Sequence, residues 1–176
     1  MKLIIGTFVS LASLFMLYLC LAIFSAPSFE VVRQKEYLHP KQTVWHKFSR
    51  FKNWESWTPW KRQDFNIRYI YSGKPGRKGA KVSWIGSEIG KGSMTVTDII
   101  PFRELNYRIH WSDWDSKTKG NIKLHETNSG TSVVWTISET LSFWMRPFGA
   151  LGFFDSQMGN DLELGLEEIA NQFSSN

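Results

Sequence analysis

Six aromatic side chains recur at every third position of one short stretch, and this spacing restricts how the chain can fold. They are Trp45, Phe48, Phe51, Trp54, Trp57 and Trp60. A helix turns about 100° per residue, so steps of three drift by about 60° and sweep most of its circumference. One straight helix would then need apolar surroundings on every side, although Lys47, Arg50 and Lys52 lie between the rings. The spacing therefore predicts two short helices with a break between them, both packed on one apolar surface.

The prolines in and before this stretch indicate where the two helices begin and end. Pro40 suits the first turn of a helix, which we expect to end near Arg50. The second helix carries Trp54 and Trp57 and closes before Pro59, since the residue that precedes a proline avoids the helical conformation. Phe51 is expected at the break, and Trp60 is expected to lead back into a sheet.

The N-terminal segment is the second strong feature, because residues 3–24 contain 22 consecutive residues without a charge. A helix of this length spans a hydrocarbon core of about 30 Å. A cleaved signal peptide would have an apolar region of roughly 7–15 residues that ends in small residues. Here Phe24 and Pro27 flank the plausible cut after Ala26, so residues 1–25 are interpreted as an uncleaved membrane anchor. Cys20, in this segment, is the only cysteine, so the chain cannot form an internal disulfide.

The orientation of this anchor rests on a nearly balanced charge count. Two positive charges, Lys2 and the terminal amine, precede the apolar segment, and two, Arg33 and Lys35, follow it. A very short N-terminal tail usually stays in the cytoplasm, and this places residues 26–176 outside it. The opposite orientation and a cleaved signal remain open.

The rest of the chain contains a series of strand patterns followed by one helical pattern. Alternating apolar residues predict strands at 29–38, 66–71, 80–84, 94–100, 105–111, 121–127 and 131–139. Short strands joined by local turns such as 86–90 indicate an antiparallel meander. The last segment changes to spacings of three and four, which predict an amphipathic helix that begins between Pro147 and Asp155. The element order indicates an α+β fold in which a curved antiparallel sheet surrounds a long C-terminal helix.

Four segments in this order resemble a known superfamily. They are residues 40–60 (PKQTVWHKFSRFKNWESWTPW), 86–94 (GSEIGKGSM), 130–135 (GTSVVW) and 158–166 (MGNDLELGL). The chain resembles the START-like, or Bet v 1-like, helix-grip superfamily (SRPBCC), and within it the bacterial polyketide cyclase/dehydrase-like group. The resemblance covers nearly all of residues 29–173, and the N-terminal anchor lies outside it.

The resemblance implies a deep, mostly apolar cavity between the sheet and the long helix. Family members bind lipids, sterols, polyketides or other hydrophobic ligands there, and a minority catalyse reactions. The residues expected to line the cavity are Tyr69, Tyr71, Trp84, Met94, Val96, Tyr107, Trp111, Trp135, Met158 and Leu162. The same large side chains fit an ordinary core equally well, because folds rich in aromatic residues pack such rings inside.

No set of residues in the sequence identifies a catalytic or metal site. The four histidines lack helical metal-site spacing, so neither a metal nor a cofactor is expected. An enzyme of the cyclase or dehydratase type is the alternative function, and its acid or base would be a cavity residue such as Asp98, His110 or Glu139. An outward, solvated position is favoured for Asp98 and His110, so catalytic residues stay unknown.

Charge is distributed unevenly along the chain. The net charge is +5, but no Lys or Arg follows Arg146, and five acidic residues do. The basic residues are scattered, which argues against nucleic acid as a partner. Docking of the basic surface on anionic lipid or on an acidic partner is a further alternative. Trp114, at a predicted hairpin tip, is a candidate membrane contact. The leading hypothesis is a membrane-anchored domain that binds a hydrophobic small molecule or lipid, without established catalysis.

Overall fold

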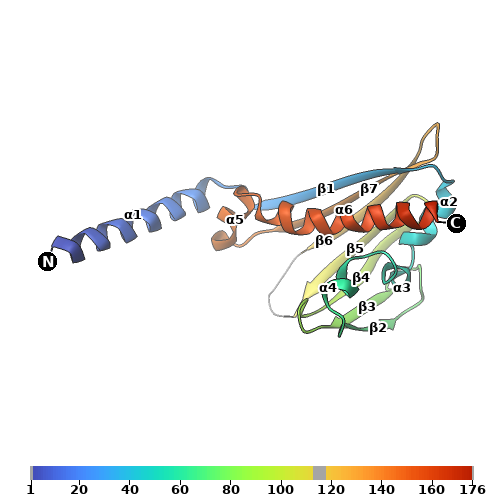
Figure 1. The fold of residues 1–176 in the computed structure, drawn as a ribbon, viewed down its shortest axis with the longest axis horizontal. Coiled ribbons are helices and arrows are strands. Elements are labelled where there is room, and N and C mark those ends of the chain that lie inside the picture. Colours follow the sequence, from blue (N-terminus) through green and yellow to red (C-terminus); the bar gives the residue numbers. More distant parts are fainter. Residues whose placement is uncertain (1, 113–117, 176) are drawn as a thin grey trace.

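A seven-stranded antiparallel sheet curves around one long helix in the part of the chain that the structure describes (Figure 1). The structure is a computed structural model and describes residues 2–112 and 118–175. Its elements are α1 Lys2–Phe24, β1 Ser28–Tyr37, α2 Lys41–Phe48, α3 Phe51–Trp54, α4 Trp60–Gln63, β2 Arg68–Ser72, β3 Lys81–Ile85, β4 Lys91–Ile100, β5 Glu104–Trp111, β6 Lys119–Glu126, β7 Thr131–Thr140, η1 Phe143–Met145, α5 Arg146–Ala150 and α6 Phe153–Ser174. The strand order is β1-β7-β6-β5-β4-β3-β2, and the predicted α+β fold is confirmed.

Alternation along the strands creates the concave apolar face of the sheet. In β5 the side chains of Leu105, Tyr107 and Ile109 are buried, whereas those of Arg108 and His110 are exposed. The neighbouring strands repeat this pattern, and their buried residues form one core cluster with the apolar face of α6. The period of two along each strand therefore determines which side chains face the helix.

Three short helices, rather than two, close the other side of this core. Ser49 and Arg50 separate α2 from α3, and the backbone of Arg50 is extended. Phe51 begins α3 instead of lying at the break. The prediction for Trp60 is wrong, because Trp60 begins α4 after Pro59, whose backbone already has helical dihedrals. Proline fixes φ in the helical range and so starts a new turn here.

Four of the core aromatic rings form one cluster between these helices, the sheet and α6. The centroid of the Trp135 ring lies 5.5 Å from those of Trp54 and Trp57, and the Trp54 ring lies 5.4 Å from that of Tyr107. Gly165 of α6 faces this cluster, and a Cβ on it would lie 3.2 Å from the Trp57 ring. Glycine therefore allows the helix to approach the aromatic cluster closely.

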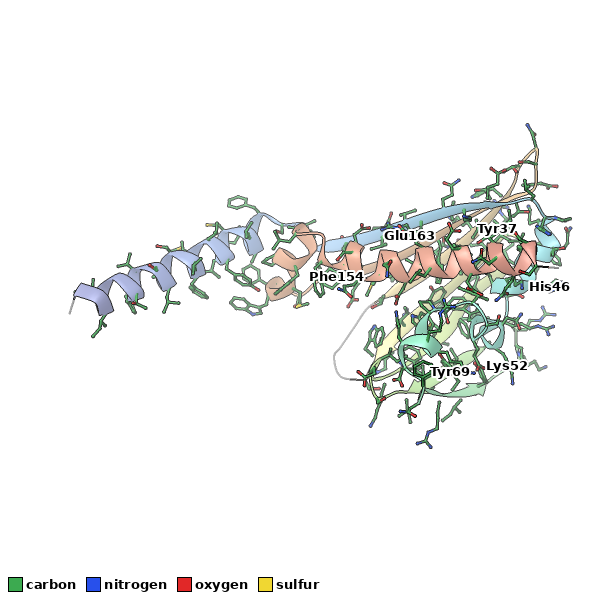
Figure 2. All side chains as sticks on the ribbon, in the orientation of Figure 1. Tyr37, His46, Lys52, Tyr69, Phe154 and Glu163 are labelled. Atoms are coloured by element: carbon green, nitrogen blue, oxygen red, sulfur yellow. The ribbon has the colours of Figure 1, made fainter. Side chains whose placement is uncertain are left out.

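The outer edge of α6 is held to β1 by ion pairs. Arg33 donates two hydrogen bonds to Asp155, of 2.9 and 3.1 Å, and its Nε lies 2.5 Å from Glu163. The guanidinium lies against Gly159, where a Cβ would approach it to 2.1 Å. Hydrogen bonding to Arg33 lowers the pKa of Asp155. Farther along, Tyr37 donates a hydrogen bond of 2.9 Å to the carbonyl of Leu166 (Figure 2).

The N-terminal helix α1 projects from the domain and is exposed along almost its whole length (Figure 1). It is long and apolar enough to cross a membrane, and only 6% of that apolar stretch is buried against the described residues. Its last turns contact η1 and α5, two short helices that the sequence patterns did not predict.

Asp64 connects α4 to the turn between β3 and β4. Its buried carboxylate accepts hydrogen bonds from the backbone N–H groups of Asn66, Glu88 and Ile89 and from the hydroxyl of Ser87. The bond from the Glu88 N–H, of 2.8 Å, is the main cause of the lowered pKa of this carboxyl. The carboxylate therefore stabilises the turn in its ionised form.

We predict that the ionised Asp64 carboxylate stabilises the folded protein and that this stabilisation is lost in acid. Its folded-state pKa is lowered, so its contribution is present above its ordinary pKa of about 3.9 and is lost as pH falls through the folded-state value. Asp64→Asn should lower the free energy of unfolding at neutral pH and reduce the loss of stability on acidification. Denaturant unfolding of the two proteins as a function of pH measures the difference.

Asp98→Asn is the matched control, because Asp98 is exposed on β4. This variant should follow the wild-type pH profile closely. An Asp64→Asn profile parallel to that of the wild type would contradict the assigned role of Asp64.

Candidate functional site

An apolar cleft lies between the N-terminal half of α6, helix α4 and strands β5 and β7. Its volume is about 610 Å³. Its apolar wall consists of Pro59, Trp60, Ile109, Trp111, Trp135, Ile137, Phe153, Met158 and Leu162. The cleft is the space that the aromatic cluster leaves open, because that cluster occupies the region facing Gly165 farther along α6.

A narrower pocket of about 220 Å³ adjoins this cleft and extends toward β3 and β4. Trp60, Gln63, Ile109, Trp111 and Asp161 line both spaces. The narrow pocket adds Trp84, Ile89 and Met94. The Trp84 and Trp111 rings meet edge to face, with centroids 5.3 Å apart. Together the two spaces form an elongated apolar site with one polar side.

The polar side consists of Asp161 with Gln63 and, in the wide cleft, Thr58, Ser156, Gln157 and Asn160. The Asp161 carboxylate accepts a hydrogen bond of 3.2 Å from Trp60 Nε1 and one of 2.9 Å from Gln63 Nε2. These contacts attach α6 to α4 and leave the carboxylate at the edge of the cleft. Sequence patterns did not single out Gln63 or Asp161 for the site, because neither belongs to an apolar stripe.

Six of the ten residues predicted to line a cavity lie around this site. Trp111, Trp135, Met158 and Leu162 line the wide cleft, and Trp84, Met94 and Trp111 line the narrow pocket. Val96 and Tyr107 are buried in the core cluster instead and are not among the residues lining the cleft. Tyr69 and Tyr71 lie on β2 at the edge of the sheet, away from α6 in the strand order.

The three tyrosines illustrate how different these positions are. Tyr107 accepts a hydrogen bond of 2.7 Å from Trp135 Nε1 inside the core, and burial raises its pKa. Tyr71 is exposed and donates a hydrogen bond of 2.7 Å to Glu55. Burial raises the pKa of Tyr69 to about 12, so its hydroxyl stays protonated at neutral pH. Tyr107 is therefore bound to a core partner, whereas Tyr71 faces the surface.

The candidate acid and base residues do not line the cleft. Asp98 is exposed because a bulge between Val96 and Asp98 reverses the alternation, so that Ile99 faces inward. The outward position favoured for Asp98 from the sequence therefore agrees with the structure, and the interior alternative does not. His110 is exposed, as favoured from the sequence. Glu139 is half-buried and accepts a hydrogen bond of 2.5 Å from Thr118.

The described residues contain no group of three or more His, Cys, Asp or Glu side chains that would hold a metal ion. Trp114, the candidate membrane contact in the hairpin, lies outside the described residues. A second depression, of about 550 Å³, lies on the outer face of the sheet, where its lining includes Glu104, Arg108 and Lys123. Its lining is mainly polar and charged, as expected for a solvated sheet face.

Comparison with known proteins identifies the family. Residues 38–170 match the family described as "Activator of Hsp90 ATPase homolog 1-like protein", and the chain belongs to this family. It is a helix-grip family, so the resemblance inferred from the four sequence segments is confirmed. No curated protein matches the chain.

Solved bacterial structures have the same fold. A solution structure from Thermobifida fusca has a TM-score of 0.65 at 16% identity and covers 83% of this chain and 93% of its own. A protein from Nitrosospira multiformis has a TM-score of 0.59 at 18% identity, covering 82% and 95%. CalU16 from Micromonospora echinospora has a TM-score of 0.53 at 15% identity, covering 80% and 74%. At these identities the likeness concerns the fold alone.

We predict that the Tyr107 hydroxyl stabilises the core. Tyr107→Phe keeps the ring but leaves Trp135 Nε1 without its acceptor, and a buried unpaired donor costs about 1–3 kcal/mol. Denaturant unfolding followed by tryptophan fluorescence should show a loss of this size. The control is Tyr71→Phe, which removes an exposed hydrogen bond and should change stability by about 0.5 kcal/mol or less. Equal effects of the two variants would contradict a role for the buried bond.

Proposed function

We propose that this protein is a membrane-anchored helix-grip protein that binds a hydrophobic small molecule or a lipid chain in the cleft beside α6. The observation that carries the proposal is the apolar cleft of about 610 Å³, which continues into the narrow pocket. Ligand sites commonly measure about 300–1,000 Å³ and combine apolar walls with a few polar groups. The wall of tryptophan, isoleucine, methionine and leucine side chains beside Asp161 fits this description.

The narrow pocket favours a ligand that carries a hydrogen-bond acceptor. Trp84 lines this pocket and is 6% exposed, and its Nε1 has no hydrogen-bond partner within residues 2–112 and 118–175. A buried N–H group without a partner is costly, so an acceptor on the ligand would be stabilising there. We therefore propose that the ligand places a carbonyl, hydroxyl or carboxylate oxygen at the narrow end and its apolar part in the wide cleft.

The anchoring part of the proposal rests on how α1 meets the domain. Its Tyr18 ring stacks on Trp144 with centroids 6.3 Å apart, and Ala22 is fully buried. These contacts favour a segment that stays with the domain over a cleaved signal. We propose a single-pass topology with the helix-grip domain outside the cytoplasm.

The residues that line the cleft favour ligand binding without catalysis over the enzymatic alternative. Asp161 is the only carboxylate that lines the cleft within the described residues, and hydrogen bonds from Trp60 and Gln63 already engage both of its oxygens. A catalytic acid or base needs a proton-transfer partner within reach of the substrate. The proposal therefore gives Asp161 a positioning role between α4 and α6.

The direct test is to purify the full chain in a mild detergent, extract it with organic solvent and identify the bound material by mass spectrometry. The proposal expects one class of apolar compound, at a constant ratio to protein. An empty protein that also fails to react with a photoactivatable fatty acid would overturn it.

A substitution that fills the cleft gives the sharper prediction. Met158→Trp places a larger ring in the cleft and should lower crosslinking by a diazirine-bearing fatty acid about tenfold, equivalent to about 1.4 kcal/mol of binding. The readout is the mass-spectrometric yield on the peptides that contain Trp60 and Trp111. The matched control is Leu164→Trp on the exposed face of the same helix, which should leave the yield unchanged. Equal yields from both variants would argue against this cleft as the binding site.

A further inference from the structure

We propose that the segment from η1 to the start of α6 is a second membrane-binding element, which dips into the bilayer beside α1. We call this segment, residues 143–153, the apolar collar. It contains one charged residue, Arg146. Its side chains at Trp144, Met145, Phe148, Leu151 and Phe153 are all exposed, Trp144 by 56% and Leu151 by 74%. So many adjacent exposed apolar side chains are unusual for a surface that faces water.

The position of the collar along α1 identifies the bilayer as its partner. Tyr18 stacks on Trp144 and donates a hydrogen bond to the Trp144 carbonyl. Tyr18 precedes the end of α1, Phe24, by six residues, which is about 9 Å along a helix. If α1 spans the membrane, as the proposed function requires, the collar lies at the depth of the last turns of α1. Apolar residues with a Trp at this level are typical of interfacial elements.

The connection between α1 and the domain keeps the collar at this depth. The backbone N–H of Leu141 donates a hydrogen bond of 2.8 Å to the carbonyl of Pro27, so the chain just before the collar is joined to the linker that follows α1. The Arg146 guanidinium lies 5.7 Å from the centre of the Phe143 ring, and its Nε is buried without a partner within residues 2–112 and 118–175. The long side chain of an arginine at an interface extends its charged end to the lipid phosphates, so one arginine among these apolar residues fits this depth.

This arrangement brings the binding cleft to the membrane surface. Phe153 is both the last residue of the collar and part of the cleft wall, and the neighbouring Phe154 lies at the end of α6 nearest α1 (Figure 2). The cleft therefore opens beside the lipid headgroups, and an apolar ligand passes between the bilayer and the cleft without crossing bulk water. The membrane that holds α1 is then also the source or the acceptor of the ligand.

The test uses the full chain in vesicles of equimolar phosphatidylcholine and phosphatidylglycerol, with one fluorescent NBD label on a single cysteine. The three labelled positions are native Cys20 in α1, Leu151→Cys in the collar, and Asn128→Cys in the exposed turn after β6, the last two in a Cys20→Ser background. Nitroxide-bearing lipids quench labels in the bilayer, and aqueous iodide quenches labels in water. The label at 151 should resemble that at Cys20 and be quenched by nitroxide lipid about threefold or more strongly than the label at 128.

Each other outcome overturns the inference in a distinguishable way. If iodide quenches the label at 151 while nitroxide lipid quenches the label at Cys20, the collar lies in water. Membrane anchoring by α1 is then supported, and membrane binding by the collar is not. If the label at 151 is shielded from both quenchers, a protein partner or a second copy covers the collar. If Cys20 is open to iodide as well, the anchor itself fails, and the proposed membrane attachment fails with it. Leu151 is strongly exposed, so the labelled variant retains the core packing.

Discussion

The packing of α6 against the aromatic cluster is the constraint on which the rest of the structure depends. Trp54, Trp57, Trp135 and Tyr107 occupy the space beneath the C-terminal half of the helix, and Gly165 allows the helix backbone to approach them. These rings fill the space between the concave sheet and the C-terminal half of α6, whereas the cleft lies beside its N-terminal half. The position of the cleft therefore follows from where the rings lie, because they occupy the corresponding space farther along the helix.

The ion pairs of β1 keep α6 in place where the aromatic cluster does not reach. Arg33 binds Asp155 and Glu163, and Lys35 lies 2.5 Å from Glu167. These charges lie on the side of α6 that faces β1, whereas Asp161 faces α4 and the cleft. Exposed pairs contribute little individually, but a bidentate arginine against a helix adds geometric specificity. The acidic C-terminal segment that made the charge so uneven along the sequence is thus matched in space to basic residues of β1 and α4.

The sequence predicted most elements of the fold because their patterns are local. The period of two located every strand, and the spacing of three and four located α6. Two features escaped this reasoning for physical reasons. The bulge before Asp98 changes which face the following residues occupy, and a pattern that assumes strict alternation cannot include it. Helices α4, η1 and α5 are too short to show a helical period, and Pro59 and Pro147 lie at their first turns.

The candidate site was harder to predict, because alternation identifies the inward face of a strand but not how deep each position lies. Tyr107 and Trp111 occupy the same face of β5, yet Tyr107 is fixed in the core by Trp135 and Trp111 lines the cleft. How deeply a side chain is buried depends on what packs against it. Tyr107 packs in the aromatic cluster, whereas Trp111 faces the N-terminal half of α6 across the cleft. Gln63 and Asp161 needed the same information, since they come together only when α4 rests on α6.

The cleft has a fixed position relative to helix α1. In many anchored proteins a flexible linker allows the domain to rotate freely, and the position of a pocket then has no fixed relation to the membrane. Here only residues 25–27 separate α1 from β1, and the bond from Leu141 to Pro27 joins this linker to the chain before the collar. The N-terminal half of α6 follows the collar directly, so the cleft lies at the end of the domain that meets α1. A helix-grip domain with its aromatic cluster at the opposite end of α6 would have its cleft at the end far from α1, so under the proposed anchoring the distribution of tryptophans along the chain determines how close the cleft lies to the bilayer.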